Sequence, residues 1–580
     1  MKKIKPIKEN FISLLPLILI LNLFVIIIYY SITYTETKLL QEYLIRIEPI
    51  FLSINFGLLI IFLILNLKDL KKMFKPIKKT TWVFLLIILF LGFYLRMYVA
   101  PRTHRVYFDE DIYLDMGKEI ATEGKGCLCN YGDQNGCKDC ILMKWPAGYP
   151  FTLALSYLLT GISENSGYNL TVFLSTLSIL LVFLIGYLLS REGKIGLYAA
   201  LLLALVPMYI IWSNSTAAEP TFNFFILLVV FSFLYALKNN TWKAITFAII
   251  CLAFAPQIRT EGVTVIVLTL AIIFFLDKKF IFNLNQKNLI IPVIIMFILL
   301  TPYLIHVYHA SKTETWGEQG ERFSFEHLKN NVPINLGFWI TGYPTIEHPT
   351  LFTIFAVIGL VYTVLKQKKI ALILCFWFLM FFLLYSSFYA GNVKFGIDVR
   401  YALNNYPPFV LLGGYGLFFI HQGLKKFLKK DLIIFFALTV LTIAYFIYFF
   451  VPAISLPADK IVEANQARVY HDRFVEYASK LDKNCYILSH VPSMYLIENV
   501  GSLQTWNGQN EKTMESLFKK TDCVIFDDGF WCNIEPYKSS VCKHMFDRYN
   551  ITELTSVAVD EGRHSYTLYK VSYSLKLINS

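Results

Sequence analysis

Charged side chains are scarce in this chain. Asp, Glu, Lys and Arg make up 16% of its 580 residues, whereas soluble proteins carry about a quarter. Hydrophobic residues make up 56%, and the mean hydropathy is +0.53. The polar residues are too few to coat a globule of this size, so most of the surface must face lipid. This composition excludes a disordered chain, a collagen and an ordinary cytosolic enzyme, and it indicates a polytopic membrane protein.

The chain also lacks a nucleotide-binding fingerprint, a sequence repeat and a basic cluster confined to one soluble module. Its net charge of +12 comes from Lys and Arg residues that lie between the hydrophobic runs. Basic residues in such positions are topology signals rather than a nucleic-acid footprint. We therefore expect no nucleic acid among its partners.

Long apolar runs recur along most of the sequence. A helix of roughly 20 residues crosses the hydrocarbon of a bilayer, and helices are favoured because the runs lack the alternation of a barrel strand. The sequence predicts thirteen spans, near residues 11–30, 49–67, 81–100, 168–190, 195–213, 221–237, 242–257, 261–277, 288–306, 350–366, 370–388, 401–421 and 431–451.

The basic residues of the short loops predict the orientation. One alternating set of loops holds 24 Lys and Arg residues, and the short loops of the other set hold 5. The positive set is expected to be cytoplasmic. The N-terminus is then inside, and an odd number of spans places the C-terminal domain outside. The run at 11–30 shows no small-residue cleavage site, so we interpret it as a retained span.

This topology divides the chain into three parts. Residues 1–80 hold two N-terminal spans, and residues 81–451 form the main membrane domain, with a long outer loop at 101–167. Within that loop, residues 149–161 are too short to span and are expected to lie along the membrane surface. The polar tail at 452–580 mixes an amphipathic segment with short β-like runs. The fold class is thus an all-α polytopic membrane domain with a small extracytoplasmic α/β domain.

Eight of the ten cysteines lie in predicted outer segments. Cys127, Cys129, Cys137 and Cys140 crowd into the first outer loop, and the tail holds Cys485, Cys523, Cys532 and Cys542. Even sets in an oxidising space predict two disulfides in the loop and up to two in the tail. The loop spacing also fits a zinc or iron–sulfur site, so both interpretations stay open for that group.

The first outer loop begins with an acidic run and ends with a basic motif. Asp109, Glu110 and Asp111 follow the third span directly, and Lys144 precedes the surface segment. Carboxylates at the membrane boundary are costly unless they serve a purpose. A plain alternative is that Asp109 caps a helix that begins there.

These motifs together resemble a known family. The pair Asp109-Glu110 with Tyr113, and Lys144-x-Pro146 before a surface helix, are similar to the integral-membrane GT-C glycosyltransferases of the protein O-mannosyltransferase and lipid A aminoarabinose transferase type. Two later stretches agree, since the segment ending at Glu219 and the Arg400-Tyr401 segment resemble that family as well. The resemblance covers roughly residues 81–451.

The sequence departs from the family pattern in three places. Two extra spans precede the acidic loop, and Trp145 and Ala147 interrupt the usual Lys-Pro-Pro-Leu motif. Asp111 adds a third carboxylate, so the sequence leaves open whether Asp109 or Asp111, two residues later, corresponds to the family's catalytic acid.

The resemblance implies a GT-C type fold and a lipid-phosphate-sugar dependent hexosyl or pentosyl transferase. Such an enzyme moves a sugar from a polyprenyl (dolichyl) phosphate donor to a hydroxyl of a protein, glycan or lipid acceptor on the outer face. A lipid phosphate leaves as a stable anion, so one base suffices, whereas a glycosidase needs two carboxylates. Asp109 is expected to be this base in an inverting reaction, with Glu110 orienting or supporting it.

Negative charge on the departing phosphate calls for cations at the outer membrane edge. The topology places Lys144, Arg259 and Arg400 there, and we expect them to bind the donor phosphate. Plain alternatives remain, because Arg400 can snorkel at a helix end and Arg259 can pair with Glu261. We expect no cofactor, although a divalent metal ion stays open.

Other functions remain to be weighed against this one. A related transferase would instead extend a lipid-linked oligosaccharide. A transporter or flippase would show paired half-domains or broken helices with charges near the membrane centre, and the sequence shows neither. A receptor would not need thirteen spans to anchor its tail.

Overall fold

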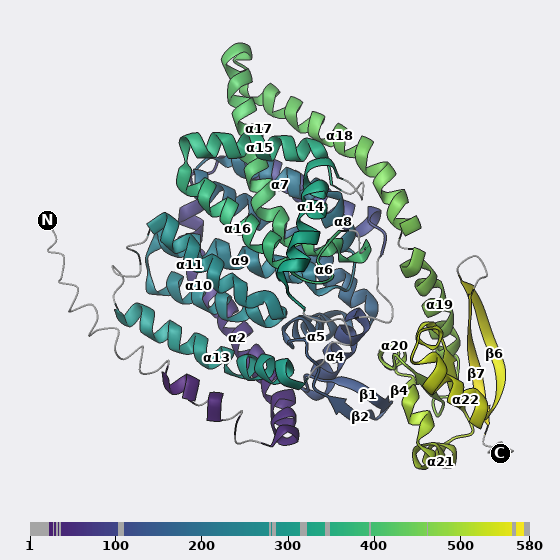
Figure 1. Ribbon diagram of the computed structural model, residues 1–580. Coiled ribbons are helices and arrows are strands. Elements are labelled where there is room, and N and C mark those ends of the chain that lie inside the picture. Colours follow the sequence, from purple (N-terminus) through teal and green to yellow (C-terminus); the bar gives the residue numbers. More distant parts are fainter. Residues whose placement is uncertain are drawn as a thin grey trace.

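The computed structural model describes most of the chain. The described residues are 22–26, 28–30, 33, 36–102, 109–277, 280, 286–313, 322–342, 348–393, 396–460, 462–559 and 564–572. The predicted span at 11–30 thus lies largely outside them, as do the N-terminal residues and the last eight residues of the tail. Figure 1 shows a large helical part, with a smaller domain of strands and short helices beside it.

The helical part follows the apolar runs of the sequence. Its long helices are α2 (Thr37–Phe74), α3 (Lys79–Tyr94), α6 (Glu164–Ser190), α7 (Gly193–Leu205), α8 (Pro207–Ser213), α9 (Ala218–Asn239), α10 (Trp242–Phe254), α11 (Thr264–Asp277), α13 (Gln286–Thr313), α14 (Phe325–Thr341), α15 (Thr350–Lys366), α16 (Lys368–Ser386), α17 (Tyr406–Leu428) and α18 (Asp431–Lys460). Shorter pieces join them: η1 (Leu95–Val99), η2 (Ala255–Ile258), η3 (Thr260–Val263) and η4 (Gly396–Asn405).

The predicted count of thirteen spans is not confirmed. Among the described residues, eight helices are long and apolar enough to cross a membrane, or nine if the bent pair α7 and α8 forms one span. Each of the other predicted runs within the described part does form a helix. However, α10 and α15 are short, and α17 contains glycine, proline, His421 and Gln422, which lower its hydropathy.

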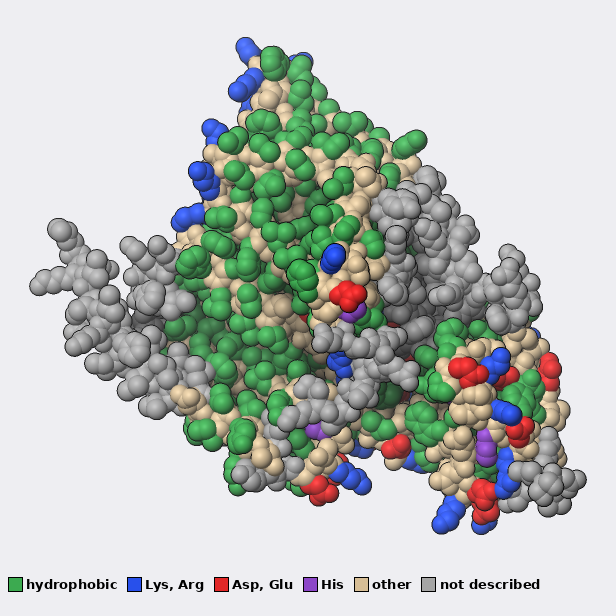
Figure 2. All heavy atoms as spheres, in the orientation of Figure 1, with side chains coloured by type: hydrophobic (Ala, Val, Ile, Leu, Met, Phe, Trp, Pro, Cys, Tyr) green, Lys and Arg blue, Asp and Glu red, His purple; other side chains and the backbone are tan. Residues whose placement is uncertain are grey.

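The helices differ in how much lipid they face. The apolar residues of α6 and α9 are mostly buried inside the protein, whereas α2, α3 and α18 expose most of theirs. Figure 2 shows the corresponding broad face of hydrophobic side chains, with Lys and Arg gathered along its upper left edge, away from the smaller domain. The chain is therefore a multi-pass membrane protein whose central helices are surrounded by other helices rather than by lipid.

One helix is broken between α7 and α8, which the sequence did not predict. Pro207 has no backbone N–H to bond the Leu203 carbonyl, and the chain bends by 63° between α7 and α8. The buried Arg96 replaces that donor, with Nη2 3.1 Å from Leu203 O and Nη1 3.3 Å from Ala204 O. The break brings residues 214–217, which follow α8, toward the first outer loop.

Close helix contact positions the segment that carries Arg400. A Cβ atom at Gly359 of α15 would lie 1.8 Å from Leu412 O, and one at Gly416 of α17 would lie 2.0 Å from Phe355 O. Only glycine allows the two backbones to approach this closely. The contact fixes α17, and η4 with Arg400 leads directly into its N-terminus.

The first outer loop folds into two helices and a hairpin. These are α4 (Asp109–Glu123), β1 (Leu128–Asp133), β2 (Gly136–Ile141) and α5 (Gly148–Thr160). The short helix predicted at 149–161 is present as α5. Its residues Tyr149 and Leu153 are fully buried, so this helix packs within the protein.

The tail contains the predicted mixture of helices and strands. Its elements are α19 (Val462–Ser479), β3 (Tyr486–Ser489), α20 (Ser493–Leu496), β4 (Gly501–Gln504), η5 (Thr505–Gln509), α21 (Glu511–Lys520), β5 (Val524–Asp528), η6 (Phe530–Asn533), η7 (Lys538–Cys542), α22 (Lys543–Arg548), β6 (Asn550–Val559) and β7 (His564–Ser572). Helix α18 continues to Lys460, past the boundary expected at residue 452.

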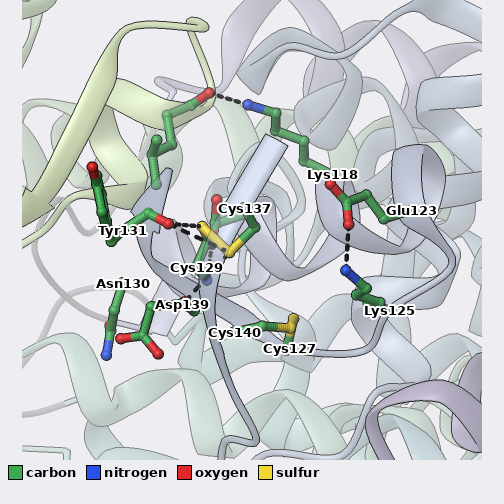
Figure 3. Close-up of a disulfide and its surroundings, with 12 residues drawn as sticks. Lys118, Glu123, Lys125, Cys127, Cys129, Asn130, Tyr131, Cys137, Asp139 and Cys140 are labelled. Atoms are coloured by element: carbon green, nitrogen blue, oxygen red, sulfur yellow. Dashed lines mark hydrogen bonds and ion pairs between the residues drawn. A yellow bond between two sulfur atoms is a disulfide. The ribbon is translucent and has the colours of Figure 1, made fainter. Parts of the chain in front are cut away.

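The sheet joins the tail to the first outer loop. Its strand order is β2-β1-β4-β3-β5-β7-β6, so the hairpin adds two strands to the five of the tail. Strand β1 pairs with β4 through Tyr131 opposite Leu503 and Gly132 opposite Ser502. Lys118 of α4 also donates a hydrogen bond to Leu496 O of α20, as Figure 3 shows. These contacts connect the tail to α4, the helix that begins at Asp109, and help to fix its position.

Four disulfides stabilise this outer part. Cys127 bonds to Cys140 and Cys129 to Cys137, so the two bonds of the hairpin are nested, and Figure 3 shows both. The tail pairs are Cys485–Cys523 and Cys532–Cys542. The predicted disulfides are confirmed, which leaves no free loop thiol for the zinc or iron–sulfur alternative.

Candidate functional site

The candidate site lies where the first residue of α4 meets Arg400, within η4. Asp109 is the first residue of α4, and its side chain is 29% exposed. The Arg400 Nη2 atom lies 3.5 Å from Asp109 Oδ2, although the Arg400 side chain is only 5% exposed. A partly open carboxylate thus sits beside a buried guanidinium, and its remaining surface is accessible to a ligand.

Glu219 lies between the buried Arg400 and the partly buried Arg259. Its Oε1 atom lies 2.6 Å from Arg259 Nη1 and 3.0 Å from Arg400 Nε, and its side chain is 1% exposed. Glu219 is in the first turn of α9, where the helix dipole also favours a negative charge. Because a buried charge is costly without a partner, each of these ions depends on the others.

A second layer of polar side chains supports Arg259. Its Nε atom pairs with Glu261 Oε1, which also accepts a hydrogen bond of 3.2 Å from the Tyr385 hydroxyl. Asn404, a few residues after Arg400, donates to the same Tyr385 hydroxyl. The two arginines are therefore connected through neutral and acidic groups that fix their orientation.

Glu110 faces the interior instead. It is fully buried, and its Oε2 accepts hydrogen bonds from the Thr216 hydroxyl at 2.8 Å and the Thr216 N–H at 3.2 Å. The Tyr149 hydroxyl donates to Thr216 O at 2.7 Å. These bonds tie α4 and α5 to the turn after α8, so Glu110 orients the start of α4.

Asp111 lies on a buried acidic face of α4. Asp111, Asp115 and Glu119 are spaced by four residues, and each is at most 3% exposed. Asp115 Oδ2 accepts a hydrogen bond of 2.7 Å from the Cys129 N–H. Burial raises the pKa of Asp115 to about 8 despite that bond. This face packs toward the hairpin and the tail, away from the opening at Asp109.

Lys144 lies beside a row of aromatic rings. Its Nζ atom is 4.5 Å from the Trp145 ring centroid. Trp145 packs edge-on against Tyr113 at 6.0 Å, and Tyr113 packs against Tyr149 at 5.1 Å.

Tyr113 connects this row to the charged group. Burial raises the pKa of its phenol, the Asp109 and Glu219 carboxylates raise it further, and Arg259 and Arg400 lower it. Tyr113 thus lies between the rings around Lys144 and the arginines.

The structure brings three of the predicted residues into one ionic group. Asp109, Arg400 and Arg259 meet through Glu219, whereas Glu110 and Lys144 lie beside the group. Sequence reasoning noted Glu219 in a motif and did not assign it a role in the site. The feature of the sequence that could have indicated this role is that Glu219 is a carboxylate at the start of an apolar run, where a charge needs a partner. Tyr385 and Asn404 carried no local signal, because their roles depend on long-range contacts.

Among the described residues, the ionic group is not one of the clusters whose ligand atoms lie close enough together to hold a metal ion. Glu219, its most buried carboxylate, contacts both guanidinium groups. Among the described residues, the two groups spaced to hold a metal are His490 with Cys532 and Cys542, and Glu119 with Cys129 and Cys137. Their cysteines are disulfide-bonded and cannot act as thiolate ligands.

One family model matches part of the chain. Residues 144–306 match the family model described as dolichyl-phosphate-mannose-protein mannosyltransferase. No curated protein sequence matches the chain.

Two solved structures share the fold. ArnT from Cupriavidus metallidurans bound to undecaprenyl phosphate matches with a TM-score of 0.56 at 14% identity, over 85% of this chain and 98% of that chain. The oligosaccharyltransferase AglB from Archaeoglobus fulgidus, in complex with an inhibitory peptide and a dolichol-phosphate, matches with a TM-score of 0.50 at 12% identity, over 86% and 75%. The chain therefore resembles the integral-membrane GT-C glycosyltransferases, as its sequence motifs predict.

Proposed function

We propose that this protein is a membrane glycosyltransferase that moves a sugar from a polyprenyl (dolichyl) phosphate to an acceptor hydroxyl on the outer face of the membrane. The single observation that carries the proposal is the Asp109–Arg400 pair, a partly exposed carboxylate 3.5 Å from a buried guanidinium. The pair supports the proposal because a carboxylate that could accept a proton lies next to a guanidinium that could bind an anion.

Asp109 is the general base in this proposal. Its carboxylate takes the proton of the acceptor hydroxyl while the oxygen attacks C1 of the donor sugar. The new C1–O bond forms as the bond from C1 to the phosphate oxygen breaks, and the electron pair leaves with the phosphate. One displacement on the face opposite the phosphate inverts the anomeric centre. Asp111 is a poorer candidate, since its side chain is buried on the other face of α4.

Arg400 and Lys144 stabilise the departing lipid phosphate. Arg400 has one nitrogen engaged by Glu219 and another beside Asp109, so its guanidinium is fixed before the donor arrives. Lys144 is half-buried beside Trp145 at the outer edge of α5, and it adds a second positive charge. Arg259 orients Glu219 and acts on the phosphate only through the electric field of the group.

The comparisons support a lipid-linked donor. The matching family is described by its dolichyl-phosphate-mannose donor, and the solved structures of similar fold contain undecaprenyl phosphate or dolichol-phosphate. Outer-face activity follows from the predicted topology, with the N-terminus cytoplasmic and the tail extracytoplasmic.

The test is release of polyprenyl phosphate from a donor labelled in its lipid. Purified protein with donor and an acceptor extract should release labelled lipid phosphate, and Asp109→Asn protein should release far less. A transporter or flippase would instead move labelled lipid across a proteoliposome bilayer without cleaving it. Translocation without cleavage would contradict the proposed function.

A further inference from the structure

A cleft of about 320 Å³ lies between the hairpin of the first outer loop and helix α21 of the tail. Figure 1 shows this hairpin extending from the helical part toward the tail. The buried side chains of Leu503 and Leu517 form the apolar floor, and Tyr131 forms one wall. None of the residues lining the cleft is acidic. It lies outside the ionic group around Asp109.

Two lysines of α21 give the cleft a positive charge. Lys512 and Lys520 both line it and are exposed. Lys520 Nζ lies 3.5 Å from the Tyr131 hydroxyl. Among the described residues, neither lysine has a carboxylate within ion-pair distance, in contrast to Lys138, which pairs with Asp133. An anion in the cleft would therefore meet two cations that have no counter-ion of their own.

A third lysine, Lys138, lies over the Tyr131 ring. Lys138 Nζ lies 5.1 Å from the centre of the Tyr131 ring. Burial lowers the pKa of Lys138, and repulsion from Lys520 lowers it further. Because Lys138 is paired with Asp133, the uncompensated positive charge of the cleft comes from Lys512 and Lys520.

The remaining polar groups suit a sugar. Asn510 caps α21, with its Oδ1 3.2 Å from the Thr513 N–H, which leaves the amide NH₂ to donate to a ligand. The hydroxyls of Thr513 and Ser516 line the same wall and can both donate and accept. The face of Tyr131 offers an aromatic surface for the apolar face of a pyranose ring.

The cleft is held rigid by bonds that span the two segments. Tyr131 pairs in the sheet with Leu503, and the Cys129–Cys137 disulfide closes the hairpin around it. A site that is ordered before binding loses less entropy when the ligand arrives. The two walls come from distant parts of the chain, so the cleft forms only when the tail joins the loop.

We propose that this cleft binds an acidic saccharide, with a sugar ring on Tyr131, its hydroxyls on Asn510, Thr513 and Ser516, and a carboxylate or sulfate group between Lys512 and Lys520. The site is separate from the Asp109–Arg400 pair. Its binding is measured without donor or turnover, so its failure leaves the proposed transferase function untouched, and the reverse also holds.

The test uses the purified full-length protein and a matched pair of probes. A tetramer of galacturonic acid carries four carboxylates, and its methyl ester has the same rings without charge. We expect the acid to bind at least about tenfold more tightly than the ester, because charge-assisted bonds to two lysines are lost in the ester. Added salt should weaken acid binding. Equal affinity for acid and ester would overturn the proposal.

Variants then locate the site. Lys512→Gln with Lys520→Gln should reduce acid affinity roughly to that of the ester, while Lys519→Gln, on an exposed neighbouring position of α21 outside the cleft, should leave it unchanged. Tyr131→Ala should weaken acid and ester alike, since stacking does not depend on charge. Unchanged binding in the double variant would overturn the proposal, as would inorganic sulfate or a poly-glutamate peptide that binds as tightly as the acid.

Discussion

The Arg400 guanidinium lies 3.5 Å from the Asp109 carboxylate, which joins the first outer loop to the segment before α17. Asp109 remains 29% exposed, while the Arg400 side chain is 5% exposed. The pair therefore has a buried, fixed member and an open member. This asymmetry separates the roles that we assign to the two residues, and it motivates the first two predictions.

We predict that Asp109→Asn lowers kcat by about 10²- to 10⁴-fold, because the substitution keeps the shape and removes the proton acceptor. Expression and donor binding should change little. Turnover of labelled donor under saturating conditions measures the effect. If Asp109 only caps α4, the substitution would be nearly silent, since Asn caps a helix about as well as Asp.

Glu110→Gln and Asp111→Asn are the matched companions of this variant. Glu110→Gln keeps an acceptor for Thr216, so we expect a smaller loss of kcat than in Asp109→Asn. Asp111→Asn should retain most activity. A large loss of kcat in Asp111→Asn, with near wild-type kcat in Asp109→Asn, would identify Asp111 as the base instead.

We predict that Arg400→Ala raises the KM for donor and lowers kcat, and that Arg400→Lys recovers only part of both. A guanidinium can bond Glu219 and a phosphate oxygen at once, whereas an ammonium acts as a point charge. Steady-state kinetics with donor varied give the two constants, and size-exclusion profiles establish that the variants are folded. Wild-type kinetics in Arg400→Ala would show that Arg400 does not act on the donor and is only a structural partner of Glu219.

We predict that Glu219→Gln destabilises the protein, because it removes the buried carboxylate that Arg259 and Arg400 share and leaves Arg259 with Glu261 and Arg400 with Asp109. Breaking a buried ion pair in this way costs about 3–5 kcal/mol. Glu219→Asp, which keeps the charge on a shorter stem, should recover part of the loss. The apparent Tm in detergent is the measurement, with the exposed Glu192→Gln as control. Equal Tm for Glu219→Gln and wild type would contradict the ionic arrangement.

We predict that Asp115 makes stability fall as pH rises between about 4 and about 8. Burial raises the pKa of this carboxyl to about 8, so in that window the folded state keeps a proton that the unfolded state has lost. Stability then decreases by up to about 1.4 kcal/mol per pH unit.

Asp115→Asn tests this directly, since the amide oxygen can still accept from the Cys129 N–H. Its apparent Tm should match wild type near pH 4 and exceed it increasingly up to pH 8. The exposed Asp139→Asn is the control. A Tm difference that does not change with pH would show that Asp115 is charged in the folded protein.

We predict that the tail lies outside the cell membrane, as the excess of 24 over 5 basic residues in alternate loops indicates. Protease added to intact spheroplasts should remove an epitope placed after Ser580. An epitope in the 68–79 loop should survive until the membrane is opened. Full protection of the C-terminal epitope would show that the orientation is not the predicted one.

The sequence alone was sufficient for features that depend on local composition. Apolar runs predict helices at membrane depth because the backbone must satisfy its own hydrogen bonds there. Each predicted run within the described residues is helical, although fewer helices than expected meet the length and hydropathy of a span. The even cysteine sets predicted the disulfides, because cysteines in an oxidising location tend to pair. Asp109 and Arg400 were found because charges are rare beside such runs.

Only the tertiary structure decided how these charges are shared. Glu219 is the centre of the site because α9 brings it between Arg259 and Arg400. Glu110 is a positioning group because it accepts hydrogen bonds from Thr216. The pairing of β1 with β4 likewise joins the loop to the tail. These contacts link residues far apart in the chain, and the low dielectric of the interior makes each charge depend on neighbours that no local sequence pattern specifies.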